Sequence, residues 1–100
     1  MADITVTETK SGGGGFEYEV VVGEGGSQTS HKVRLEKEYY ERLTEGRTSP
    51  DELVRKSFEF LLENEPKEAI LGSFDLSVIE RYFPEYPRVI KNAFDRRVYR

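Results

Sequence analysis

Two neighbouring stretches alternate between apolar and polar residues, and this pattern constrains the fold more than any other feature. Every second residue from Phe16 to Val22 is apolar or aromatic, and a similar alternation runs from Thr29 to Leu35 after a glycine-rich break. Period-2 alternation is typical of a β-strand with one buried face, and glycines permit the positive φ angles of a chain reversal. Residues 16–35 are therefore predicted to form an antiparallel hairpin.

A single register satisfies both faces of this hairpin if Val22 lies opposite Thr29. The apolar face then contains the pairs Val20–His31, Tyr18–Val33 and Phe16–Leu35, and the outer face contains Glu19–Lys32 and Glu17–Arg34. Opposite charges and apolar side chains are favourable cross-strand pairs, each contributing roughly 0.2–1 kcal/mol. A shift of one residue loses this agreement, so we predict this register.

The segment before the hairpin, residues 1–15, allows two interpretations. Ile4-Thr5-Val6-Thr7 has the composition of an edge strand, but the same segment can also be a loose arm. The glycine run 12–15 lacks the Lys-Ser/Thr sequence of a phosphate-binding loop and leads into a strand rather than a helix. We interpret this run as a flexible linker.

The spacing of apolar residues becomes helical after Leu35. Tyr39, Tyr40 and Leu43 share one face of a short helix that Gly46 is expected to end. Ser49-Pro50-Asp51-Glu52 has the residues of a helix N-terminus, with serine as the N-cap, proline at the first helical position and an acidic residue three positions after the cap. This signal predicts a helix from about residue 50 to residue 64.

The rest of the chain is also predicted to be helical. Pro66 is expected to open a helix in which Ala69, Ile70 and Phe74 share a side. Asp75 is expected to cap a further short helix that ends at Pro84. The final helix or tail is expected to have an apolar face that begins at Val89 and extends to Val98. The predicted organisation is a single domain over residues 1–100, divided into an arm or edge strand with its linker (1–15), a hairpin (16–35), a helical half (36–83) and a basic C-terminal helix or tail (84–100).

Strands followed by helices are the element order of an α+β domain. We expect an N-terminal antiparallel hairpin or three-stranded meander, followed by four or five short helices packed on one face of the sheet. Phe60 falls off the apolar stripe of its predicted helix and is expected to meet one of the later helices.

The charge distribution argues against a general nucleic-acid or membrane binder. Residues 1–83 contain 10 Lys and Arg against 17 Asp and Glu, a charge of -7, whereas residues 84–100 contain 5 against 2, a charge of +3, which together give the net charge of -4. Affinity for phosphate polymers depends first on basic side chains. A basic segment on an acidic body favours docking of that segment on the protein itself over a nucleic-acid arm.

The Cys and His content of the chain excludes several kinds of catalytic and metal site. The chain has no Cys and a single His, which excludes disulfides, thiolate nucleophiles and multi-histidine metal sites. His31 lies on the core-facing side of its strand with no partner to orient it for acid–base work, so we interpret it as a structural side chain. We expect no catalytic residues, cofactor or metal, no membrane association and a cytoplasmic location.

Residues 32–63 resemble the ribbon–helix–helix family of DNA-binding proteins. The resemblance covers Lys32-Val33-Arg34-Leu35, Glu38 to Leu43 and Gly46 to Arg55. In that family a strand from each of two protomers forms a ribbon that enters the major groove. The resemblance implies that Lys32 and Arg34 read bases and that Ser49 binds phosphate, but Glu17 and Glu19 are predicted to lie beside the two basic side chains.

The run from Phe74 to Tyr86 also looks like small bacterial proteins of unknown function, a resemblance that implies no mechanism. Within it, Arg81-Tyr82-Phe83-Pro84-Glu85-Tyr86-Pro87 concentrates three aromatic residues and two prolines. These residues either complete the core or form an interaction surface, because aromatic and arginine side chains are enriched at protein interfaces. Arg81, Tyr82 and Tyr86 are the candidate partner-binding residues.

The effects of truncating Tyr86 and Phe83 on stability distinguish these two interpretations. Tyr86 lies between two prolines, so its truncation is predicted to change stability by less than about 1 kcal/mol, whereas a buried Phe83 is predicted to cost about 3 kcal/mol or more. The functional hypothesis is a small non-catalytic protein that acts through protein contacts or self-association. A dimeric ribbon–helix–helix-like DNA-binding regulator is the alternative.

Overall fold

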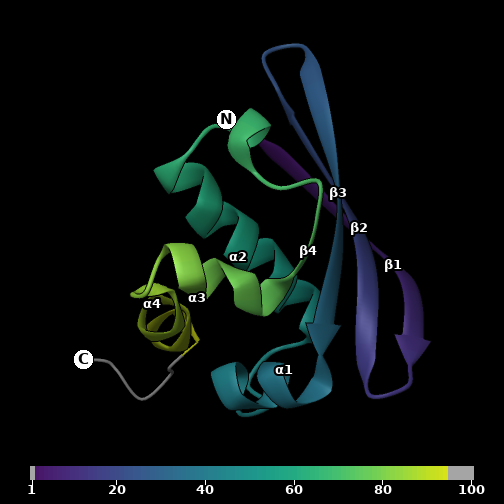
Figure 1. Cartoon of the computed structure of the whole chain (residues 1–100), viewed down its shortest axis with the longest axis vertical. Coiled ribbons are helices and arrows are strands. Elements are labelled where there is room, and N and C mark those ends of the chain that lie inside the picture. Colours follow the sequence, from purple (N-terminus) through teal and green to yellow (C-terminus); the bar gives the residue numbers. More distant parts are fainter. Residues whose placement is uncertain (1, 95–100) are drawn as a thin grey trace.

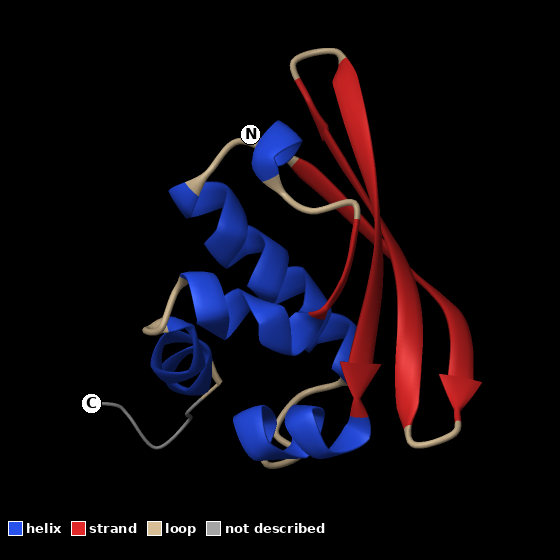
Figure 2. Cartoon of the chain, viewed as in Figure 1, coloured by secondary structure: helices blue, strands red, loops and turns tan. Residues whose placement is uncertain are grey.

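The protein consists of a twisted four-stranded sheet with helices covering one of its faces (Figure 1). The computed structural model describes residues 2–94, and in this range the chain forms four strands, four α-helices and two short 3-10 helices. Figure 2 shows the strands forming one layer and the helices the other. The predicted α+β class, with an N-terminal strand meander followed by helices, is confirmed.

The first three strands form an antiparallel meander. They are β1 (Asp3–Gly12), β2 (Gly15–Glu24) and β3 (Ser27–Glu36). All six predicted pairs between β2 and β3 are present, from Phe16–Leu35 to Val22–Thr29. The register in which both faces of the hairpin have favourable pairs was therefore sufficient to predict how β2 and β3 pair.

The N-terminal segment is an edge strand, which resolves the two alternatives that the sequence left open. Gly13 and Gly14, with φ angles of 62° and 86°, form a two-residue turn between the paired residues Gly12 and Gly15. The interpretation of this glycine run as a flexible linker is therefore wrong, because two glycines at positive φ suit a tight hairpin turn.

The first two helices follow the sequence signals closely. Helix α1 (Lys37–Thr44) ends where Glu45 and Gly46 adopt positive φ angles. Helix α2 (Pro50–Asn64) has the predicted bounds, and the Ser49 side chain accepts a hydrogen bond from the Glu52 amide at 3.1 Å. This N-cap satisfies one of the amide groups that the first turn of a helix leaves without an intrahelical partner.

The segment after α2 differs from the prediction. Instead of a helix containing Ala69, Ile70 and Phe74, the chain forms the 3-10 helix η1 (Lys67–Ala69) and then strand β4 (Ser73–Asp75), which pairs in parallel with β3. The sheet order is therefore β1-β2-β3-β4, with α1, α2 and η1 in the crossover between the two parallel strands.

Three further helical segments complete the described chain. They are the 3-10 helix η2 (Leu76–Val78), α3 (Ile79–Tyr82) and α4 (Tyr86–Ala93). Asp75 caps η2 as predicted, since its side chain accepts from the Ser77 amide at 3.0 Å. The predicted extension of the final apolar face to Val98 lies outside the described residues.

The core lies between the helix-facing side of the sheet and α2. Fully buried side chains include Val20 and Leu35 from the sheet and Leu53 and Phe58 from α2. Phe60 meets the later segments as predicted, with ring centroids 5.6 Å from Phe83 and 5.4 Å from Tyr86. In residues 2–94, no helix combines the length and apolar character needed to cross a membrane.

Candidate functional site: an open apolar cavity beside α3

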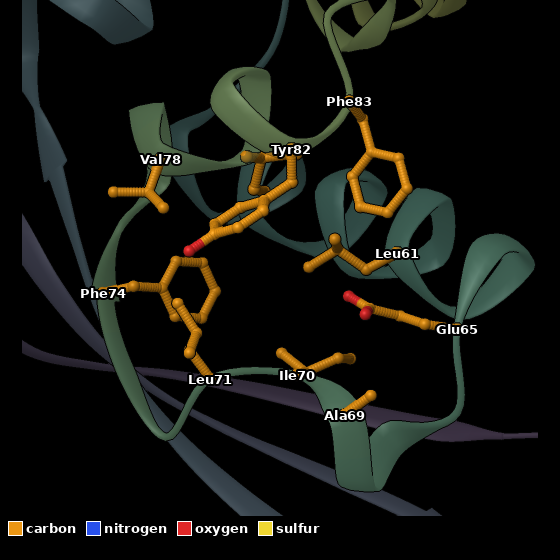
Figure 3. Close-up of a pocket in the computed structure, with 10 residues that line it drawn as sticks. Leu61, Glu65, Ala69, Ile70, Leu71, Phe74, Val78, Tyr82 and Phe83 are labelled. Carbon is orange, nitrogen blue, oxygen red and sulfur yellow. The ribbon is translucent and has the colours of Figure 1, made fainter.

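An open cavity of about 360 Å³ lies between the C-terminal end of α2, the η1–β4 segment and α3 (Figure 3). Its lining is mainly aliphatic and aromatic. The lining residues are Leu61, Glu65, Ala69, Ile70, Leu71, Phe74, Val78, Ile79, Tyr82 and Phe83. The cavity is thus built from consecutive segments of the chain, from the end of α2 to the end of α3, that meet only in the folded protein.

The floor and the mouth of the cavity differ in exposure. Leu61, Ile70 and Ile79 are buried and belong to the core, whereas Leu71 is 47% exposed and Tyr82 is 67% exposed. Exposed apolar side chains scattered singly are ordinary on a protein surface, but two that line one hollow form a continuous apolar patch. The cavity therefore offers an apolar contact surface to solvent.

His31 holds one wall of the cavity against the sheet. The His31 Nδ1 atom lies 2.7 Å from the Leu71 carbonyl oxygen, and Nε2 lies 2.8 Å from the Thr29 hydroxyl. Because a carbonyl oxygen only accepts, Nδ1 carries a proton and donates it to Leu71. The Lys32 amide also donates to the Gly72 carbonyl at 2.8 Å, so β3 fixes the backbone at residues 71 and 72.

Two polar side chains reach the cavity. Figure 3 shows the Glu65 carboxylate directed inward beside Leu61, and the Tyr82 hydroxyl on the opposite side near Phe74. Within residues 2–94, the Glu65 carboxylate has neither a hydrogen bond nor an ion pair. An acceptor without a partner beside apolar walls is a recognition element for a cationic or hydrogen-bond-donating ligand group.

The three predicted partner-binding residues occupy different environments. Tyr82 lines the cavity and is exposed. Arg81 is exposed on α3 but does not line the cavity. Tyr86 is completely buried, so its assignment as a surface contact is wrong.

Tyr86 is buried because it begins α4 rather than a loop. Its hydroxyl lies 2.6 Å from Ser57 Oγ, and Ser57 Oγ lies 2.7 Å from the Leu53 carbonyl oxygen. The single hydroxyl proton of Ser57 goes to Leu53, so the Tyr86 hydroxyl is the donor in the other bond. Burial raises the pKa of Tyr86 well above its usual range.

The residues implied in DNA reading are not brought together. Lys32 and Arg34 alternate with the buried residues of β3 and so lie on the sheet face away from the helices, whereas Ser49 begins α2 on the covered side. Strand β3 also has β2 on one edge and β4 on the other, in the same chain. The two-protomer ribbon of the ribbon–helix–helix family is therefore not the arrangement of β3.

A shallow groove of about 640 Å³ on the outer sheet face contains both basic side chains of β3. Its other charged residues are Glu17, Glu19 and Asp75. Arg34 forms ion pairs with Glu36 at 2.6 Å and Glu17 at 3.3 Å, and these carboxylates, Glu36 foremost, raise its pKa. The acidic side chains therefore offset the positive charge that would attract a phosphate backbone.

Some of the cavity residues were missed from the sequence. Leu71 and Phe74 fell in a segment interpreted as a helix, although Gly72-Ser73 between them is a signal for a break in that helix. Glu65 was one of many acidic residues, and only the fold distinguishes it by its position in the cavity. Tyr82 was identified because it lies in the aromatic run.

Comparisons with known proteins add no identification. No protein-family model, no curated protein and no solved structure matches this chain. Among the described residues, no three His, Asp or Glu side chains gather as a metal-binding group.

Proposed function

We propose that this chain is a small non-catalytic protein-interaction module whose cavity beside α3 receives an apolar side chain of a partner protein. The observation that carries the proposal is the placement of Leu71 and Tyr82, two exposed large hydrophobic residues, at the mouth of one apolar cavity. Apolar anchors seated in such pockets supply much of the binding energy at protein interfaces. The cavity therefore has the character of an anchor site.

The chemistry of the lining supports binding rather than catalysis. Its ionisable side chains are one carboxylate, Glu65, and one phenol, Tyr82, and they come from different segments without a hydrogen bond between them. Nucleophilic and acid–base catalysis require a nucleophile or base held by an orienting partner. The hydrogen bonds from the His31 side chain and the Lys32 amide of β3 give the cavity a preformed wall, which lowers the ordering cost of binding.

A random peptide library displayed on phage tests this function with the full chain as the immobilised target. We expect enriched peptides with a large apolar residue, and binding by a selected peptide, measured by isothermal titration calorimetry, should weaken about tenfold or more in Tyr82→Ala and Leu71→Ser. Val89→Ala is the matched control, because Val89 is 37% exposed on α4 and does not line the cavity.

Two results would overturn the proposal. The first is a library that yields no enriched peptide against the folded chain. The second is a selected peptide whose affinity is the same for the wild type, the two cavity variants and Val89→Ala. Far-UV circular dichroism of each variant verifies that the comparison is made between folded proteins.

DNA binding receives less support. The outer groove places Lys32 and Arg34 among three carboxylates, and the part of β3 that contains them is paired with β2 on one edge and with β4 on the other. We expect only weak, non-specific affinity for mixed duplexes at near-physiological salt, measured by fluorescence anisotropy. Submicromolar, sequence-selective binding that is lost in Lys32→Ala or Arg34→Ala would favour the DNA-binding alternative.

A further inference from the structure

We infer that the partner segment carries a lysine or arginine next to its apolar anchor, and that Glu65 is the residue that recognises it; this inference rests on the proposed interaction function. Glu65 is half-buried, and its carboxylate is directed into the cavity beside Leu61 (Figure 3). A carboxylate in such a place has lost part of its water and gains from a cationic donor that enters with the partner.

The protein itself supplies no such donor in the described part of the chain. Lys67 is close in sequence and is buried, but its Nζ atom is bonded to the Glu68 carboxylate at 2.8 Å. That bond to Lys67 lowers the pKa of Glu68. Glu68, which lies within η1, is therefore paired inside the chain, and Glu65, which precedes η1, is left for a ligand.

The charge of the whole chain favours the same kind of partner. The net charge is -4, and a negatively charged protein attracts positively charged ligands over long distances. An acidic segment would instead bring a second carboxylate close to Glu65 in a partly dehydrated place, which is costly. Charge complementarity thus selects a basic–apolar peptide segment of a partner protein as the occupant.

The position of Glu65 also predicts how such a segment lies. The buried floor formed by Leu61, Ile70 and Ile79 accepts the apolar anchor, and Glu65 stands at the α2 side of the same cavity. A basic residue next to the anchor reaches this carboxylate while its aliphatic stem remains against the apolar wall. The cavity and the carboxylate then act together as one recognition site.

Peptides from the library selection provide the probe. Each selected peptide is synthesised in three forms that differ at the position next to the apolar anchor, which is Lys, Gln or Glu. We expect the Lys form to bind the wild type about tenfold or more tightly than the Gln form, and the Glu form to bind most weakly, because a charge-assisted hydrogen bond is stronger than a neutral one and like charges repel. Raising the salt concentration should weaken only the Lys form.

Glu65→Gln tests the assigned residue, and Glu63→Gln is its matched control. Glu63 is an exposed glutamate of α2 that does not line the cavity. Glu65→Gln should remove the preference for the Lys form over the Gln form, whereas Glu63→Gln should preserve that preference. In each variant, the affinity of the Gln form is the reference against which the preference for Lys is measured.

The outcomes separate this inference from the function on which it rests. Peptides that bind at the cavity with no preference for Lys, or with a preference that survives in Glu65→Gln, overturn the inference and leave the interaction function standing. Absence of any cavity-dependent peptide contradicts both. Self-association of the wild type in sedimentation that Glu65→Gln abolishes would assign the cavity to a second copy of this chain and overturn the choice of a separate partner.

Discussion

Truncation of Tyr86 to alanine is expected to destabilise the protein severely. Tyr86 is completely buried, and its ring packs against Phe60 with a centroid separation of 5.4 Å. An aromatic side chain that buries about 150–250 Å² at about 25 cal/mol per Å² contributes up to about 4–6 kcal/mol, and measured aromatic-to-alanine changes cost about 3–5 kcal/mol. We therefore expect Tyr86→Ala to lower the free energy of unfolding by about 4 kcal/mol.

The hydroxyl and the ring of Tyr86 are separable. Tyr86→Phe keeps the ring and removes only the bond to Ser57, whose own proton remains bound to the Leu53 carbonyl. No buried donor is left without a partner, so Tyr86→Phe should cost only about 1 kcal/mol. This variant also reports on the site if Tyr86→Ala does not fold, because a total stability of about 5–15 kcal/mol leaves little margin for the larger loss.

Urea denaturation followed by far-UV circular dichroism measures these differences. Tyr82→Ala is the control, because Tyr82 belongs to the same aromatic run but is 67% exposed, and it should change stability by less than about 1 kcal/mol. A loss below about 1 kcal/mol in Tyr86→Ala would refute the packing of α4 on α2 through this residue. Equal losses in Tyr82→Ala and Tyr86→Ala would refute the division of the run into an exposed and a buried side.

Three further predictions follow from particular contacts. Burial raises the pKa of Tyr86 in the folded state, so its contribution to the free energy of unfolding is complete below about pH 10, where the tyrosine of the unfolded chain titrates, and is lost as the pH rises further. Urea denaturation at a series of pH values should show a smaller alkaline loss of stability in Tyr86→Phe than in the wild type. Gly15→Ala places a Cβ atom 2.8 Å from the Leu35 carbonyl oxygen and should cost about 1–3 kcal/mol by urea titration, whereas Gly23→Ala, with its nearest neighbour at 3.7 Å, should cost less. Ser49→Ala should cost about 1 kcal/mol in the same assay through loss of the α2 cap, and no loss would contradict that role.

Much of the fold was predictable because its signals are local. The β2–β3 register follows from two faces that agree, and the start of α2 follows from Ser49 and Pro50. Strand β4 was not predictable in this way, because three residues are too short to show a period. Its conformation depends on parallel pairing with β3, a contact between residues about 40 positions apart.

One of the two prolines that flank Tyr86 belongs to a helix. Pro87 lies in the first turn of α4, where a missing amide proton costs nothing because that amide has no intrahelical acceptor. The two prolines were therefore a helix-start signal for residue 86 as much as a break after residue 83. Similarly, the glycine run before β2 contained the Gly-Gly turn that joins β1 to it.

The candidate site was predictable only where one residue type stood out. Tyr82 was found through the aromatic run, but its partners Leu71 and Glu65 come from segments that are separate in sequence. The backbone around Leu71 is fixed by His31 and Lys32, which are about 40 residues away. A site assembled by contacts of that range has no periodic signature in the chain.

The aromatic run around α3 is divided between residues that pack in the core and a residue that lines the open cavity. Phe83 and Tyr86 both pack against Phe60, so the segment after α3 is held to α2 by two ring contacts. Tyr82 is then free of a role in the core and lies at the mouth of the cavity. An apolar surface that is fixed by buried contacts suits the binding of a partner's side chain, because little conformational entropy is lost when the partner binds.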